Sequence, residues 1–246
     1  MISISTLHEG DDIIQNALRY SIGFEYSGFV NHANHTTQKA EEFIKGNLIT
    51  KVTSIHGPFV DLMPASIDKD LSMVARKRIF SGIRMCEDTG INRIVFHSGW
   101  FPKTYSDDLW ISNAVEFWTD VKNYKKPQTV VLIENVYEDR PDVLKKLIDE
   151  LGDETVRVCL DIGHVNVNSN IDLRAWIEEL NERIGHVHFH NNNGKNDDHN
   201  GLNTGSINIE ETCAVLKQNC PGARWNLEIL NNVEESIKMI VELEER

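Results

Sequence analysis

The chain has 246 residues, which suits one large α/β barrel or one open sheet better than two comfortable domains. Its composition is that of a folded globular protein, with 40% hydrophobic residues and no low-complexity tract that would indicate a disordered arm. The formal net charge of -13 argues against nonspecific nucleic-acid binding, because the protein as a whole repels a polyanion.

Two further features of the sequence concern its targeting segments and its cysteines. The first residues lack the basic and apolar regions of a signal peptide, and no apolar run approaches the roughly 20 residues of a membrane span. We therefore expect a cytoplasmic protein that does not enter a membrane. The cysteines have no C-x-x-C spacing, so we expect them to pack as small apolar residues; they are Cys86, Cys159, Cys213 and Cys220.

Short β-branched runs alternate with amphipathic stretches eight times along the chain. The predicted strands are residues 2–6, 22–27, 52–59, 93–99, 129–135, 156–163, 184–190 and 224–230. The predicted helices are residues 11–20, 37–46, 69–89, 107–123, 140–150, 172–181, 208–219 and 233–245. Eight such units predict an α/β protein with a (β/α)8 TIM barrel, a single domain over residues 1–246.

Ionisable side chains lie in or at the end of six predicted strands, where a barrel gathers them at one mouth. They are His56, His97, Glu134, Asp161, His188 and Glu228. Each alone is more often a satisfied core residue. Together they would repel or remain poorly solvated unless a cation or a hydrogen-bond network compensated them. Mixed carboxylate and imidazole ligands favour a divalent transition metal over magnesium or calcium.

The stretch HVHFH places three histidines on one face of the seventh predicted strand, since successive side chains of a strand point to opposite sides. His188 is the strongest ligand candidate of the three. We expect His186 to lie deeper, as packing or as a group behind the ligand. We expect His190 at the rim of the barrel, where it would meet substrate or water.

Two further pairs could supply ligands. Asp197 and His199 stand two residues apart in an extended polar loop, although a solvated surface loop would look the same. Asp161 and His164 could be a ligand at the strand end and a second ligand one turn onward. They could also be a helix cap and a surface histidine, but the neighbouring ligand candidates favour the first interpretation.

Several other side chains would face the same mouth. Trp100 and Phe101 follow the fourth predicted strand and could form an aromatic wall for a sugar, to which Phe59 would add unless it packs in the core. Lys195 could meet a phosphate or a hydroxyl, although exposed loop lysines are usually only solvated.

Three more residues near the second predicted strand have two interpretations each. His32 and His35 lie after that strand and face the mouth or, more commonly for such a position, the surface ahead of a helix. Glu25 could contact substrate or a histidine behind the ligands, and a structural ion pair is an equal alternative.

Taken in order, several motifs resemble those of the xylose-isomerase-like barrels, which include sugar and sugar-phosphate isomerases and epimerases and also endonuclease IV. The motifs are IHGPFVDL, VFHSG, LIENV, CLDIGH, HVHFHNN followed by DDH, and NLEI. The resemblance implies one divalent ion, zinc or manganese by preference, held by Glu134, Asp161, His188 and Glu228. It also implies that Glu134 and Glu228 are the catalytic groups, which move a proton through a metal-stabilised enediolate.

The resemblance to endonuclease IV implies a larger metal centre, of up to three ions. All nine of its ligand positions are retained here: His56, His97, Glu134, Asp161, His164, His188, Asp197, His199 and Glu228. The flanking residues depart from its pattern, because ENV lacks a Thr-Ala-Gly continuation and DIGH replaces Asp-Thr-Cys-His. NNNGKNDDH likewise replaces the Asn-Asp-Ser-Lys and Asp-Arg-His segments. The elements that read DNA therefore look absent.

We therefore predict a metal-dependent isomerase or epimerase of a small sugar, sugar phosphate or polyol. The alternatives are an endonuclease IV-like phosphodiesterase, a related dehydratase or lyase, and a non-catalytic metal-binding barrel. The expected partner is a small carbohydrate and not nucleic acid, and the oligomeric state is open, a homo-oligomer included. The predicted substrate-binding residues are His56, His97, Trp100, His190 and Lys195.

Overall fold

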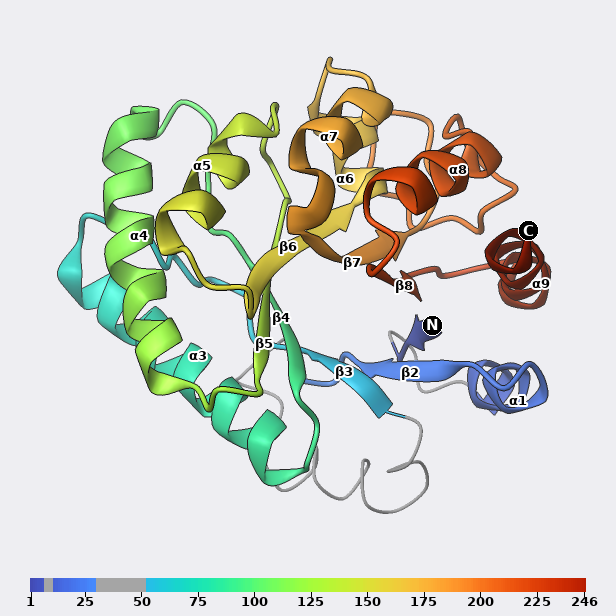
Figure 1. The fold of residues 1–246 in the computed structure, drawn as a ribbon, viewed down its shortest axis with the longest axis horizontal. Coiled ribbons are helices and arrows are strands. Elements are labelled where there is room, and N and C mark those ends of the chain that lie inside the picture. Colours follow the sequence, from blue (N-terminus) through green and yellow to red (C-terminus); the bar gives the residue numbers. More distant parts are fainter. Residues whose placement is uncertain (7–10, 30–51) are drawn as a thin grey trace.

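The computed structural model describes residues 1–6, 11–29 and 52–246. Eight parallel strands form a closed barrel in chain order (Figure 1). The barrel closes where β1 pairs with β8, with Ser3 beside Asn226 in the register. The strands are β1 Ile2–Ser5, β2 Gly23–Tyr26, β3 Val52–His56, β4 Arg93–His97, β5 Val130–Glu134, β6 Val156–Asp161, β7 Ile184–Phe189 and β8 Arg224–Leu227. The predicted (β/α)8 barrel is confirmed.

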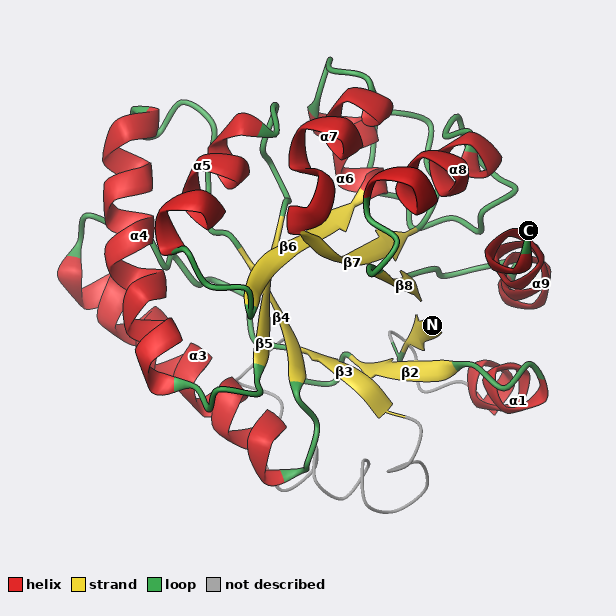
Figure 2. Cartoon of the chain, in the orientation of Figure 1, coloured by secondary structure: helices red, strands yellow, loops and turns green. Residues whose placement is uncertain are grey.

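Helices surround the strands on the outside of the barrel (Figure 2). Those in the described part of the chain are α1 Asp11–Arg19, α3 Lys69–Asp88, α4 Asp107–Tyr124, α5 Asp142–Leu151, α6 Ile162–Asn168, α7 Leu173–Leu180, α8 Ile209–Asn219 and α9 Val233–Glu245, with a 3-10 turn η2 at Asn181–Arg183. The predicted helix 37–46, His32 and His35 lie outside the described residues.

Local signals set the helix ends. The Asp68 carboxylate accepts the backbone N–H of Asp70 at 2.9 Å, which satisfies a free donor at the start of α3. Asn208 caps α8 in the same way by accepting the N–H of Glu211. α5 ends at Gly152, whose φ of 56° lies in the left-handed region that favours glycine.

Strand side chains alternate between the helical layer and the barrel interior. Outward residues pack with helices, as Phe96 of β4 does with Trp118 of α4, their ring centroids 6.2 Å apart. Inside the barrel, Val95, Leu132 and Cys159 form a small apolar cluster separate from the main core. All four cysteines are buried free thiols, as predicted, and burial raises the pKa of each.

One difference from the sequence prediction bears directly on the site. The sixth strand ends at Asp161, and the chain turns at once into the short helix α6 instead of continuing as strand to residue 163. The turn forms because the Asp161 carboxylate accepts the backbone N–H of His164 at 2.7 Å. The third, fourth and eighth strands also end two or three residues before their predicted limits.

We find no helix within the described ranges that combines the length and the apolar character needed to cross a bilayer.

Candidate metal centre

The carboxyl ends of the strands bring the predicted site residues together. His97 and Glu134 are register neighbours across β4 and β5, and Asp161 and His188 are neighbours across β6 and β7. Glu228 follows β8 directly, and its backbone N–H donates to the carbonyl of Phe189, the last residue of β7, at 3.0 Å. Ladder pairing therefore continues one residue past β8 and aims Glu228 into the same mouth.

Three carboxylates converge on one imidazole at the centre of the mouth. Nδ1 of His188 lies 2.9 Å from Oε2 of Glu228, 3.0 Å from Oε1 of Glu134 and 3.8 Å from Oδ2 of Asp161. One ligand atom from each of the four residues lies within 4.8 Å of the others, and all four side chains are buried. We call Glu134, Asp161, His188 and Glu228 the central cluster.

Asp161 is held so that one of its oxygens stays free. Its Oδ1 accepts the N–H of His164 and lies 3.0 Å from Nε2 of His190. The Asn135 side chain fixes the Asp161 backbone on both sides, accepting its N–H at 2.8 Å and donating to its carbonyl at 2.9 Å. Oδ2, which faces His188, is buried and has no hydrogen-bond partner among the described residues. Such an orphaned oxygen is what a bound cation would satisfy.

The charges of the central cluster are mutually dependent. Burial alone would lower the pKa of His188, but the carboxylates around it, Glu228 and Glu134 among them, raise that pKa well above 6.5. Conversely, burial would raise the pKa of Glu134, and the imidazoles of His188 and His97 hold it well below 4.5. The pKa of Asp161 falls to about 2 because the nearby His164 and His190 outweigh the effect of its burial.

The residues of the central cluster therefore fit a divalent transition metal. Three carboxylates and one imidazole are a donor set that such ions accept. The carboxylates are compensated here by protons on imidazoles, and a cation would compensate them in the same place.

Two more histidines approach Glu134 from its other side. Nε2 of His56 lies 3.1 Å and Nε2 of His97 lies 3.5 Å from Oε2 of Glu134. Nδ1 of His56 lies 3.0 Å from the carbonyl of Gly57, which can only accept, so Nδ1 carries a proton and Nε2 is the atom presented to Glu134. The ring of His97 stacks on Phe59, and burial lowers the pKa of His97 to about 3.

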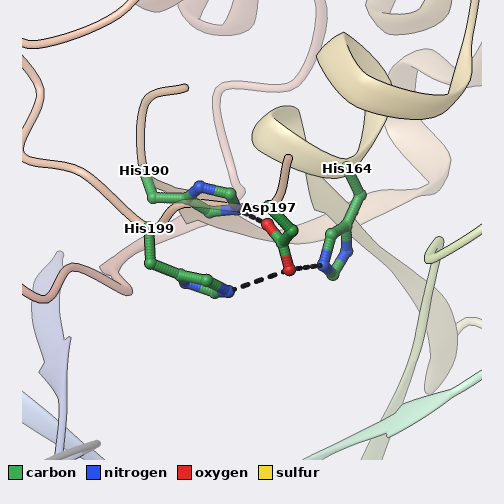
Figure 3. Close-up of side chains that lie close together, drawn as sticks. All are labelled: His164, His190, Asp197 and His199. Carbon is green, nitrogen blue, oxygen red and sulfur yellow. Dashed lines mark hydrogen bonds and ion pairs between the residues drawn. The ribbon is translucent and has the colours of Figure 1, made fainter. Parts of the chain in front are cut away.

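Figure 3 shows a second group of potential ligands. It lies beside the central cluster, since Nε2 of His190 is 3.0 Å from Oδ1 of Asp161. It consists of His164, His190, Asp197 and His199, whose ligand atoms lie within 4.8 Å of one another, and we call it the loop cluster. Oδ2 of Asp197 lies 3.2 Å from Nε2 of His164 and 3.1 Å from Nε2 of His199. Both histidines direct Nδ1 at backbone carbonyls, those of Asn135 and Glu228, so both present Nε2 to Asp197.

The loop that carries Asp197 is pinned at its base. Asn191 and Asn200 pair through two backbone hydrogen bonds of 2.9 Å, which close the loop between them. The carbonyl of His199 accepts the N–H of Leu230 at 2.8 Å, and His199 itself has a left-handed φ of 46°. The loops after β7 and β8 are therefore tied together at His199.

One expected position needs correction, and one alternative is excluded. His190 is fully buried within the loop cluster instead of lying at the rim. Gly163 makes room for it, because a Cβ at that position would lie 1.9 Å from the His190 ring. His164 is both a member of the loop cluster and the residue whose N–H the Asp161 cap accepts, and it is buried, so it is not a surface histidine.

The predicted substrate-binding residues fall into three environments. Two of these residues, His56 and His190, are buried among the candidate ligands. His97 and Trp100 line a pocket of about 520 Å³ together with Phe59, Asp61, Phe101 and Tyr137. Lys195 is exposed, and no ion pair joins it to another residue in the part of the chain that the structure describes. Its proposed contact with substrate therefore gains no support from its neighbours.

Sequence reasoning overlooked one buried acid and left another undecided. Glu138 is almost completely buried, accepts the N–H of Val136 at 2.7 Å and is hydrogen bonded by Ser98, and burial raises its pKa to about 7. No motif or spacing marks it in the sequence. Glu25, for which a structural ion pair was one of two interpretations, lies beneath the central cluster with its side chain fully buried. His186 lies deep, as expected, 3.1 Å from Glu25.

Curated relatives match part of the chain. The uncharacterized protein MJ1311 of Methanocaldococcus jannaschii is 25% identical over 174 residues, which are 67% of this chain and 59% of that protein. A probable endonuclease 4 of Mesoplasma florum is 25% identical over 200 residues, 73% of this chain and 67% of that protein. The chain thus aligns with less than two thirds of the archaeal relative.

Solved structures match almost the whole chain and show the same fold. A Thermus thermophilus protein, TTHB071, soaked with ZnCl2, has a TM-score of 0.82 at 20% identity, covering 98% of this chain and 97% of that one. A D-tagatose 3-epimerase-like protein has a TM-score of 0.78 at 21% identity, covering 99% and 97%. The IOLI protein with a bound zinc atom has a TM-score of 0.76 at 12% identity, covering 99% and 97%.

The family model described as xylose isomerase-like TIM barrel matches residues 21–243. That range contains every residue of the central and loop clusters. The resemblance noted in the motifs is confirmed, and the chain belongs to the xylose isomerase-like TIM barrel family.

Proposed function

We propose that the protein is a divalent-metal-dependent isomerase or epimerase of a small sugar, sugar phosphate or polyol. The observation that carries the proposal is the convergence of three carboxylates on Nδ1 of His188 within a buried mouth. In this proposal Glu134, Asp161, His188 and Glu228 hold the metal, zinc or manganese by preference. The metal would supply Lewis acidity, which makes a C–H beside a carbonyl easier to deprotonate.

The chain's own carboxylates would move the proton. Glu134 ends β5 and Glu228 follows β8, so the two approach Nδ1 of His188 from separate strands. Nearby imidazoles keep the pKa of both below the ordinary value despite burial, so both are ionised and able to accept a proton at neutral pH. One carboxylate would take the proton from the substrate and the other would return one, on the same or the opposite face.

The pocket beside His97 would hold the remainder of the substrate. Phe59, Phe101 and Tyr137 offer aromatic faces, and Asp61 offers a carboxylate among them. Trp100 also lines the pocket but is mostly buried in the core. Aromatic faces stack on the C–H face of a sugar ring, and carboxylates accept hydrogen bonds from its hydroxyls. This mixture suits a carbohydrate better than a purely apolar ligand.

The fold neighbours give the proposal its context. One of them is described as similar to D-tagatose 3-epimerase, and another carries a zinc atom. Those properties belong to those proteins, and they support a sugar substrate and a metal here only through the shared fold.

Solvent deuterium exchange tests the proposal directly. Protein loaded separately with zinc, manganese or cobalt is incubated with a panel of ketoses in deuterium oxide, and incorporation beside the carbonyl is followed by NMR. We expect uptake with at least one ketose and loss of uptake in Glu228→Gln. An Asp198→Asn variant is a matched control, since Asp198 lies in the polar loop but in neither cluster. Absence of uptake from every ketose by metal-loaded protein would contradict an isomerase or epimerase.

A second function, phosphodiester hydrolysis, is favoured by the loop cluster. A single-metal isomerase has no need of four further ligands at His164, His190, Asp197 and His199, whereas hydrolases of phosphodiesters pair metals to activate water and neutralise the leaving oxygen. The relative described as a probable endonuclease 4 points the same way. The net charge of -13 points against a DNA substrate. Nicking of an abasic duplex by metal-loaded protein would reverse our ranking.

A further inference from the structure

The barrel interior beneath the central cluster is polar where TIM barrels usually pack branched apolar side chains. Six polar residues from β1, β2, β3, β7 and β8 lie there, each no more than 3% exposed: Ser3, Ser5, Glu25, Ser54, His186 and Asn226. Burying this many polar groups is unfavourable unless each finds a partner. Glu25 is the only one of the six that is an acid.

The Glu25 carboxylate meets potential donors on both oxygens. Oε2 accepts the Ser54 hydroxyl at 2.7 Å and lies 3.1 Å from Nε2 of His186. Oε1 accepts Nδ2 of Asn226 at 3.3 Å and lies 2.9 Å from Nε2 of His188. The contact with His188 falls short of hydrogen-bond geometry, and Nε2 of His188 has no hydrogen-bond partner among the described residues. Four side chains from three strands thus surround this carboxylate.

The surrounding network fixes the position of the carboxylate. Oδ1 of Asn226 accepts the Ser3 hydroxyl at 2.8 Å, and Nδ2 donates to the Ser5 hydroxyl at 2.7 Å and to Glu25. The Asn226 amide therefore has one orientation that satisfies all three contacts. Glu25 and Ser54 are register neighbours on β2 and β3, which places the hydroxyl directly beside the carboxylate.

His188 presents its two nitrogens to two different sets of acids. Nδ1 faces Glu134, Asp161 and Glu228, whereas Nε2 faces Glu25. An ionised carboxylate oxygen can only accept, and an unprotonated ring nitrogen at 2.9 Å would oppose its lone pair to that oxygen. Nε2 therefore carries a proton in this contact, and by the same argument so does Nδ1 beside Glu134 and Glu228 in the metal-free protein. A metal at the central cluster would displace the Nδ1 proton, and the Nε2 proton would stay with Glu25. A neutral imidazole with a proton on Nε2 has its lone pair on Nδ1, the atom that faces the proposed ligands.

We propose that Glu25 is a positioning residue of the metal centre, whose carboxylate holds the Nε2–H form of His188 and thereby makes Nδ1 the ligand atom. This inference rests on the metal centre of the proposed function and not on the identity of the reaction. A carboxylate behind a ligating histidine orients the ring and increases its basicity, and removing such a partner typically costs about 10- to 100-fold in metal affinity. Ser54, His186 and Asn226 would hold the carboxylate in place.

The first test needs no substitution. Protein labelled with 15N in its histidines is loaded with zinc, and long-range 1H–15N correlations report which ring nitrogen of His188 is protonated and which is bound. The signals are assigned by their loss in His188→Asn. We expect a protonated Nε2 and a zinc-bound Nδ1. Zinc on Nε2, or a protonated Nδ1 in the loaded protein, would overturn the inference.

The second test measures zinc affinity by competition with a chelator in the absence of substrate. We expect Glu25→Leu to weaken zinc binding about 10- to 100-fold. Glu25→Gln should weaken it less, since its amide oxygen can still accept from Nε2. Ser54→Ala should also weaken it less than Glu25→Leu, because it removes one contact to Oε2 and leaves Oε1 facing His188. Ser72→Ala is the matched control: this buried serine of α3 donates to the Pro64 carbonyl and is not part of the Glu25 network, so affinity should not change.

Circular dichroism of the metal-free variants separates a positioning role from loss of fold. A folded Glu25→Leu protein with the affinity and the His188 signals of the wild type would overturn the proposal. Zinc affinity and the His188 signals do not depend on which reaction the protein catalyses. A wild type that binds zinc through Nδ1 but exchanges no ketose proton would contradict the proposed function and leave the role of Glu25 intact.

Discussion

Oε2 of Glu134 lies 3.1 Å from Nε2 of His56, a residue 78 positions away in the chain. The other oxygen of the same carboxylate lies 3.0 Å from Nδ1 of His188. One side chain thus joins the central cluster to the histidines of β3 and β4. Changing it should disturb both sets of contacts, whereas a change at Glu228 touches His188 alone of the three imidazoles.

We expect Glu134→Gln and Glu228→Gln both to abolish proton exchange, because each removes an ionised carboxylate that is proposed to carry the proton. They should differ in metal content: Glu134→Gln should lose more zinc, since it weakens two groups of ligands at once. Deuterium uptake and elemental analysis of dialysed protein measure the two effects. Full turnover by a folded Glu228→Gln protein would remove that residue from its role.

If the loop cluster holds an ion of its own, as phosphodiester hydrolysis would require, Asp197→Asn should lower the number of bound ions without preventing binding at the central cluster. The carboxylate of Asp197 contacts His164 and His199, and it is not a member of the set around His188. Elemental analysis at saturating zinc should show about one ion fewer per chain than the wild type. Equal zinc content in the two proteins would show that the loop cluster does not hold an ion.

Metal affinity should rise with pH. The acids around His188 and His164 raise the pKa of each well above 6.5 despite burial, and those around His199 raise its pKa to about 9. These imidazoles are therefore protonated in the metal-free protein at neutral pH, and a metal must displace each proton. Affinity should increase about tenfold per pH unit for each proton displaced. Zinc titrations in weak buffer should release protons, and an affinity that stays constant between about pH 6 and about pH 8 would contradict this account.

Glu138→Gln should change the pH dependence of stability. Because burial raises the pKa of Glu138 from 4.5 to about 7, the folded state binds this proton more tightly than the unfolded state. The stabilisation is complete below about pH 4.5 and is lost as the pH rises through about 7, an effect on the order of 3 kcal/mol. The Glu138→Gln variant has no titrating carboxyl at this position, so its stability does not decrease for this reason as the pH rises.

Urea unfolding of wild type and Glu138→Gln at several pH values gives the comparison. The difference between their free energies of unfolding should shift in favour of the variant from about pH 5 to about pH 8. A difference that does not vary with pH would show that Glu138 does not titrate in this range.

Phe101→Ala should weaken substrate binding with little effect on the fold. Phe101 lines the pocket beside His97 and is 37% exposed, so its ring is available to a ligand. Loss of one aromatic contact of about 1 kcal/mol corresponds to roughly a fivefold rise in KM. Leu109→Ala is the control, since Leu109 is an exposed apolar residue outside this pocket. Equal KM values for Phe101→Ala and the wild type would place the substrate elsewhere.

The barrel was predictable because strand-like runs and stretches of helical period alternate regularly along the chain. Runs such as TVVLIEN are too short for a helix and rich in β-branched residues, and each is followed by a stretch of helical period. The same regularity placed Glu134, Asp161 and His188 at strand ends, and the register brings those ends to one mouth. Their metal-binding roles remain predictions.

The features that the sequence did not predict depend on contacts between side chains and backbone that local patterns do not record. We expected His190 at the rim because the alternation of side chains along a strand shows which side a residue faces but not how deeply it is buried. Its burial follows from the space left by Gly163. Helix α6 begins through one side-chain contact from Asp161, a feature that periodicity does not register. Glu138 accepts a hydrogen bond from Ser98, which is 40 residues away, and no local sequence pattern predicts this contact.

The paired backbones of Asn191 and Asn200 have a consequence for how tightly the loop between them can bind. A flexible loop must give up conformational entropy whenever it closes on a ligand. Here that ordering has already taken place during folding, so Asp197 and His199 are preorganised, and association at their side chains should proceed with little entropic penalty.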